Sequence, residues 1–72
     1  MEIDSLVRMA NQIAANVAHH PADQAADEVA AHLRSFWAPS MRRRLAEWVV
    51  DEGGSGLDPV ARTAVDRLGV VP

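Results

Sequence analysis

The residue types that bind metals or act as acid–base catalysts are few in this chain, and their spacing does not bring them together. His19, His20 and His32 are the only imidazoles, and cysteine is absent. Neighbouring residues of a helix end point in different directions, so His19 and His20 do not form a ready pair of metal ligands. The absence of cysteine excludes thiolate zinc sites, ordinary iron–sulfur ligation and disulfides. We therefore predict no metal site, with His19 and His20 in the turn before Pro21 and His32 on a helix flank.

The serines and the glycine-rich stretch lack the neighbours that nucleophilic catalysis or phosphate binding requires. None of the serines stands in a nucleophile-elbow motif or beside a catalytic lysine. The stretch GGSG at residues 53–56 lacks the Lys and Ser/Thr of a phosphate-binding loop, and it follows a predicted helix rather than a strand. The sequence therefore predicts no catalytic and no cofactor-binding residue in this chain.

Three consecutive arginines begin the third predicted helix, where the helix dipole disfavours cations. On a helical wheel Arg42 and Arg44 flank the apolar side. Two interpretations are open for each of them. The aliphatic part of the side chain packs on the edge of the apolar side, with Arg44 stacking on Trp48, or the guanidinium pairs with carboxylates of another chain. Arg43 lies on the outer side with Val50, an apolar residue in a position that should meet water. We therefore predict a partner-binding surface formed by Arg42, Arg43, Arg44 and Val50.

A second candidate surface is the amide-rich outer side of the first predicted helix. Asn11, Gln12 and Asn16 lie there, and Arg8 is the one charge among them. Amides are buried at lower cost than charges when their hydrogen bonds are made, so Asn11 and Gln12 are compatible with a protein interface. An ordinary solvent-exposed polar face explains the same pattern, and both interpretations stay open here.

The elements that would position these residues are short amphipathic helices. Apolar residues recur at three- and four-residue spacing, which predicts helices over residues 4–18, 21–37, 39–52 and 59–68. Asp4 and Asp58 are predicted N-caps, and prolines suit the first turns of the last three helices. No alternating strand pattern is present. The sequence predicts an all-α fold, a small bundle of three to four short amphipathic helices that forms a single domain over residues 1–72.

The predicted core includes the aromatic residues around Pro39. Phe36 falls on the inner stripe of the second helix, and Trp37 and Trp48 are expected to fasten the second and third helices together. Leu33 and Leu45 complete this part of the core.

The overall charge and hydropathy exclude several classes of protein. The net charge is −3 and lysine is absent, which disfavours non-specific nucleic-acid binding. No apolar run reaches the ~18 to 20 residues of a membrane span, and no signal peptide is recognisable, so we expect a cytoplasmic protein.

The competing hypothesis is a small helical regulator or DNA-binding module with a helix–turn–helix over residues 22–50. The acidic Asp51 and Glu52 at the end of its third helix oppose this.

Three stretches together resemble a known family: RMANQI, HLRSFWAPSMRRRL and GGSGLDPVARTAVDRL. In this order they are similar to the small delta subunit of cytoplasmic, NAD-dependent molybdenum or tungsten formate dehydrogenases. The most specific part of the resemblance is the cluster Phe36, Trp37, Pro39, Met41 and Arg42. The family commonly has an acidic residue before this proline and an arginine after it, where this chain has Ala38 and Ser40.

The resemblance implies a role in a bacterial complex that oxidises formate to carbon dioxide and reduces NAD. In that complex the partner subunits would hold the molybdopterin, the iron–sulfur clusters and FMN. The implied partner is the catalytic alpha subunit, with the beta and gamma subunits in the same assembly. The delta subunit would be a non-catalytic accessory that either stabilises the alpha subunit or assists cofactor insertion.

Overall fold

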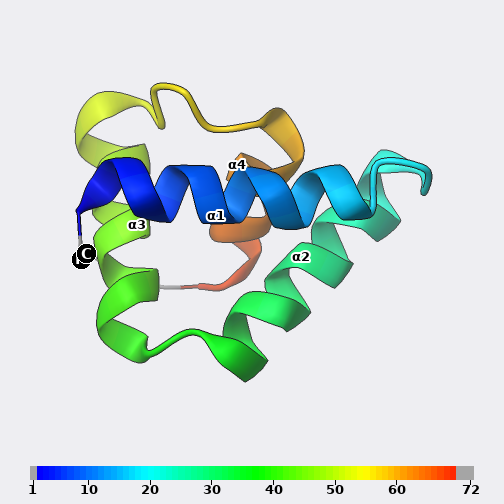
Figure 1. The fold of residues 1–72 in the computed structure, drawn as a ribbon, viewed down its shortest axis with the longest axis horizontal. Helices are drawn as coiled ribbons and strands as arrows, with labels where there is room; N and C mark the ends of the chain where they lie inside the picture. The colour runs from blue at the N-terminus through cyan, green and yellow to red at the C-terminus, as the bar shows by residue number, and fades with distance from the viewer. Residues whose placement is uncertain (1, 70–72) are drawn as a thin grey trace.

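Four α-helices make up most of the described part of the chain, residues 2–69 of a computed structural model (Figure 1). Their bounds are α1 Ile3–Asn16, α2 Ala22–Phe36, α3 Pro39–Glu52 and α4 Pro59–Arg67. No strand occurs among residues 2–69, so the predicted all-α bundle is confirmed. Residue 1 and residues 70–72, which the predicted domain over residues 1–72 includes, lie outside the described residues.

The helix ends follow most of the predicted turn and cap residues, although Pro21 is the N-cap of α2 and not part of its first turn. The side chain of Asp58 caps α4 as predicted, because its Oδ1 accepts a hydrogen bond of 2.8 Å from the backbone N–H of Val60. Asp4 is not an N-cap: α1 begins one residue earlier, and Asp4 lies in its first turn, where a negative charge still suits the helix dipole. Helix α1 also ends at Asn16, two residues before the predicted end.

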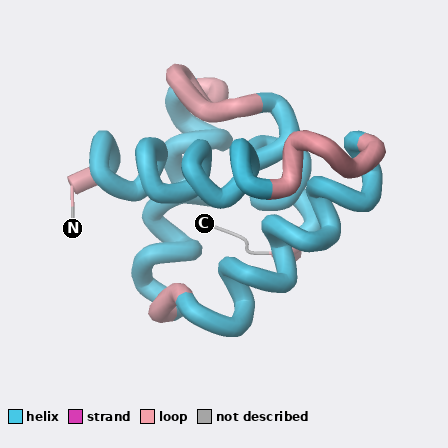
Figure 2. The backbone as a smooth tube through the Cα atoms, turned by 45° about the vertical axis from the view of Figure 1, so that its right-hand side comes forward, coloured by secondary structure: helices cyan, strands magenta, loops and turns pink. Residues whose placement is uncertain are grey.

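Helix α1 lies across the other three helices and contacts each of them (Figure 1). Helix α4 lies behind α1 and packs most extensively on α2. The loop of residues 53–58 returns from the end of α3 alongside α1 to reach α4, as the tube in Figure 2 shows. This loop starts at Gly53, whose φ of +65° is a left-handed conformation that glycine adopts without strain. None of the helices within residues 2–69 has both the length and the apolar character needed to cross a lipid bilayer.

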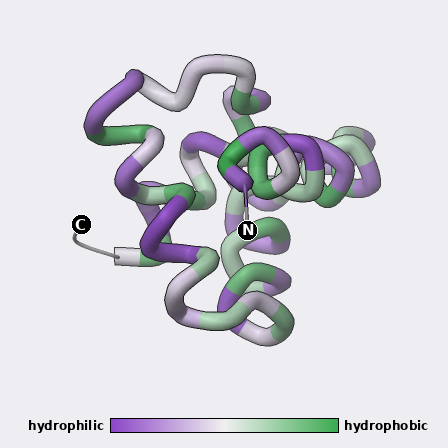
Figure 3. Tube along the Cα trace, turned by 60° about the vertical axis from the view of Figure 1, so that its left-hand side comes forward, coloured by the Kyte–Doolittle hydropathy of each residue, from purple (hydrophilic) through white to green (hydrophobic). Residues whose placement is uncertain are grey.

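The core is built from a few large aliphatic residues and many alanines. Apolar and polar segments alternate along each helix (Figure 3), as expected of amphipathic helices. The largest fully buried side chains are Leu6, Val29, Leu33 and Leu45. On α2 and α4 most of the buried residues are alanines, namely Ala25, Ala26, Ala30, Ala61 and Ala64. Small side chains at a helix contact allow a short distance between the helix axes, so α4 can lie close against α2.

The three aromatic residues of the predicted core take three different environments. Trp37 is 6% exposed and is confirmed as a core residue, whereas Phe36 is 75% exposed and its predicted inward position is wrong. The reason is that α2 ends at Phe36 and the backbone becomes extended at Trp37, with φ −93° and ψ 140°, so that of these two neighbours only Trp37 faces inward. Trp48 is half-buried, and its indole Nε1–H donates a 2.8 Å hydrogen bond to the carbonyl of Ser55 in the loop.

Candidate partner-binding surface

Arg42, the first of the three consecutive arginines, binds the carboxyl end of the preceding helix. Its Nη1 donates to the carbonyl oxygen of Arg34 at 2.9 Å and, more weakly, to that of Leu33 at 3.4 Å. The last carbonyls of a helix have no partner within the helix and carry a partial negative charge. The start of α3 lies beside the end of α2, so a cation that the dipole of α3 disfavours is stabilised by the dipole of α2. Arg42 therefore has a role within the fold.

Arg42→Ala is expected to destabilise the isolated chain, whereas Arg43→Ala should leave its stability nearly unchanged. The loss of a charged hydrogen bond to helix-end carbonyls at a part-buried site costs about 1 to 2 kcal/mol, which corresponds to a drop of about 4 to 15 °C in melting temperature for a domain of this size. A surface substitution away from such contacts stays within about 0.5 kcal/mol. Thermal unfolding followed by circular dichroism measures both, and equal melting temperatures for the two variants would show that the Arg42 contacts contribute nothing.

The rest of the predicted surface on α3 is open. Arg43 and Arg44 are exposed, and Val50 is 66% exposed. No cation–π contact between Arg44 and Trp48 is present within residues 2–69, so the predicted stacking is not formed. Arg44 instead borders a shallow depression with Leu6, Ser40 and Met41. Arg43, Arg44 and Val50 are thus available for contact with another chain.

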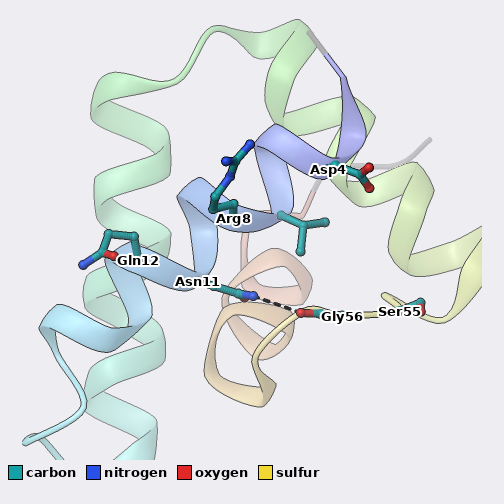
Figure 4. A pocket seen from close by; sticks show the side chains of 7 residues that line it. Asp4, Arg8, Asn11, Gln12, Ser55 and Gly56 are labelled. Atoms are coloured by element: carbon teal, nitrogen blue, oxygen red, sulfur yellow. Dashed lines mark hydrogen bonds between the residues drawn. The ribbon is translucent and has the colours of Figure 1, made fainter.

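The amide of Asn11 is also engaged within the fold. Its Nδ2 donates to the carbonyl of Gly56 at 2.9 Å, and its Oδ1 accepts from the backbone N–H of Asp58 at 2.7 Å. The first of these bonds is visible in Figure 4. Trp48 holds the same loop from the side of α3 through Ser55. The half-buried Asn11 therefore fixes the path of the loop from α3 to α4.

An open depression of about 420 Å³ lies between the outer side of α1 and this loop. Figure 4 shows the side chains that line it, which are Asp4, Val7, Arg8, Asn11, Gln12, Ser55 and Gly56. Gln12, the second predicted amide, is exposed here, and its Nε2 lies 3.4 Å from the Oδ1 of Asn16. The structure thus brings Asn11 and Gln12 to one surface. The three consecutive arginines lie on α3 and do not line this depression.

A cluster of charges around Arg67 was not predicted from the sequence. Arg67 Nη2 lies 2.8 Å from Asp23 Oδ1, and Nη1 lies 2.8 Å from Asp27 Oδ1. Hydrogen bonds first to the Asp23 side chain and then to that of Asp27 raise the pKa of Arg67 above its ordinary value. The backbone carbonyl of Arg67 in turn accepts a 2.7 Å hydrogen bond from Arg34 Nη2. The sequence holds one signal, the i,i+4 spacing of two acidic residues on α2, but it does not identify a cation 40 residues away.

The histidines occupy the predicted positions. His19 and His20 lie in the turn before Pro21, and His20 Nε2 is 3.2 Å from Glu28 Oε2. His32 lies on the exposed side of α2, where its ring centroid is 4.7 Å from that of Phe36. Within residues 2–69, His, Asp and Glu form no group of three or more that could hold a metal ion.

A protein-family model provides the decisive comparison. The model for the NADH-dependent formate dehydrogenase delta subunit, FdsD, matches residues 5–65. The chain belongs to this family. The match begins in the first turn of α1 and extends into α4, and so covers both candidate surfaces of this delta subunit. Searches among curated proteins and among solved structures give no significant match. Because FdsD is a subunit of a multi-subunit formate dehydrogenase, membership of this family implies partner subunits.

Proposed function

We propose that this chain is a non-catalytic accessory subunit of an NAD-dependent formate dehydrogenase, and that it stabilises the molybdopterin-containing alpha subunit or helps to assemble it. The observation that carries this proposal is the FdsD match over residues 5–65. The beta and gamma subunits belong to the same cytoplasmic complex, and the partner subunits hold the molybdopterin, iron–sulfur clusters and FMN.

The distribution of polar side chains supports this proposal. Contacts within the chain engage some of its acid–base and anion-binding groups: His20 lies beside Glu28, and Arg67 binds two aspartates. Of the residues in the two predicted surfaces, Arg43, Arg44 and Val50 on α3 and Gln12 on α1 are open to another chain. In our proposal the α3 group faces an acidic patch of the alpha subunit. Arg42 contributes by fixing the start of α3, and the surface around Asn11 and Gln12 is the second contact.

Co-expression of the tagged chain with the alpha, beta and gamma subunits tests the proposed function. We expect the tagged chain to co-purify with the other subunits and the isolated chain to oxidise no formate. A complex prepared without the chain should contain less molybdopterin or lose activity faster on warming.

Adding the purified chain to the incomplete complex separates the two accessory roles. Recovery of thermal stability would indicate stabilisation, whereas a molybdopterin deficit that the chain cannot repair would indicate assistance during assembly. Failure of the parent chain to co-purify, or formate oxidation by the isolated chain, would refute the proposal.

A further inference from the structure

The most exposed large apolar side chain of the described residues is Phe36, at the corner where α2 meets α3. Its ring lies 4.7 Å from that of His32, at an interplanar angle of 42°, so the two form one aromatic surface. A single exposed apolar residue is ordinary in a soluble protein and carries no inference alone. We define the α2–α3 corner as His32, Phe36, Arg43 and Arg44, because a second feature coincides with the aromatic pair.

This second feature is a separation of charge along the chain. Residues 29–46 contain four of the seven arginines and His32, and no acidic residue. The segment has a formal charge of +4, which leaves −7 on the remainder of a chain whose net charge is −3. Arg34, Arg43 and Arg44 of this segment are exposed. The segment that carries the exposed ring of Phe36 is therefore positively charged, on an otherwise acidic molecule.

The corner is held rigidly by contacts already described. Only Trp37 and Ala38 separate α2 from α3, and Trp37 is buried. Arg42 binds the carbonyls at the end of α2 and so sets the direction in which α3 leaves. Chain geometry limits the Cα distance between Phe36 and Arg43 to about 17 Å. A surface that is ordered before binding loses little conformational entropy when a partner docks.

We propose that the α2–α3 corner docks on an acidic segment of a partner subunit, with Phe36 packing in an apolar recess and Arg43 and Arg44 pairing with carboxylates around it. This inference rests on the proposed function and names Phe36, rather than Val50, as the centre of the contact. Aromatic and arginine side chains dominate the energy of many protein interfaces, and guanidinium groups bind carboxylates in a bidentate manner. A nucleic acid fits less well, because the remaining −7 charge would repel its phosphates.

Co-purification of tagged variants with the other subunits, at low and moderate salt, tests this docking surface. Phe36→Ala should reduce the co-purified subunits by about tenfold or more at either salt concentration. Arg43→Glu should do so most strongly at low salt, where neither the lost attraction nor the new repulsion between carboxylates is screened. Arg62→Glu is the matched control, since it reverses another exposed arginine, on α4, outside both candidate surfaces, and it should assemble like the parent.

The outcomes separate this inference from the proposed function. If the parent assembles and Phe36→Ala assembles equally well, the corner is not the docking surface, although the accessory role remains. If the parent itself does not co-purify, the proposed function fails first. Circular dichroism of each isolated variant checks that it is folded. If Phe36→Ala has a lower melting temperature than the parent, Arg43→Glu still tests the docking surface. A dimer of the isolated chain that Phe36→Ala abolishes, or duplex DNA binding that Arg43→Glu abolishes, would assign the corner to another occupant and overturn the inference.

Discussion

Trp37→Ala is expected to leave the isolated chain largely unfolded at room temperature or to lower its melting temperature drastically. Trp37 is 6% exposed and packs in the same cluster as Leu33 and Leu45. Truncation of a buried tryptophan costs about 3 to 5 kcal/mol, and a chain of this length has a total stability near the lower end of the usual range of about 5 to 15 kcal/mol. Urea unfolding followed by far-ultraviolet circular dichroism measures the loss.

The adjacent aromatic residue provides the control for this substitution. Phe36 is 75% exposed, so Phe36→Ala removes a large ring from the same turn without opening a cavity. We expect its free energy of unfolding to stay within about 0.5 kcal/mol of that of the parent. If Trp37→Ala and Phe36→Ala unfolded at the same urea concentration, burial of Trp37 would not be what stabilises the junction of α2 and α3.

Ala61→Leu is expected to have the second largest effect on stability. Ala61 has no exposed surface, and it lies on α4, the helix that packs most extensively on α2. A leucine there has to push the helices apart or adopt a strained rotamer, which costs about 1 to 3 kcal/mol and occasionally more. Thermal unfolding and the intensity of the near-ultraviolet tryptophan signal would report the loss of stability and of tight packing.

The same substitution at Ala31 gives the matched comparison. Ala31 lies on the exposed side of α2, and alanine and leucine have similar helix propensities. Ala31→Leu should therefore change the melting temperature little. If Ala61→Leu were equally well tolerated, the core around Ala61 would have room for a larger side chain, contrary to the full burial of Ala61.

The helices could be predicted from the sequence because their signals are local. Periodic apolar residues, the prolines and the capping Asp58 all act within a few residues, and the observed bounds lie within two residues of the predicted ones. Phe36 was misplaced because periodicity extends the inner stripe to the last residue of a helix. It does not tell which of two adjacent aromatic side chains turns inward where the backbone leaves the helix.

The candidate surfaces could be predicted less completely, for a chemical reason. The sequence identifies no partner within the chain for Asn11 or Arg42, because no complementary side chain lies at a suitable spacing. Their observed partners are backbone groups, of Gly56 and Asp58 for the amide and of Leu33 and Arg34 for the guanidinium. Every residue offers a carbonyl oxygen, so no pattern of side chains in the sequence identifies such an acceptor.

The two hydrogen bonds of Asn11 also bear on how long the folded state persists. They join residues separated by 45 and 47 positions, so a long segment of chain has to be ordered before both can form. We expect these two bonds to form after the transition state for folding, and interactions absent from the transition state slow unfolding without accelerating folding. We therefore expect the amide of Asn11 to act mainly on the unfolding rate. A bundle with so few large core residues then owes part of its lifetime to a single polar side chain at its surface.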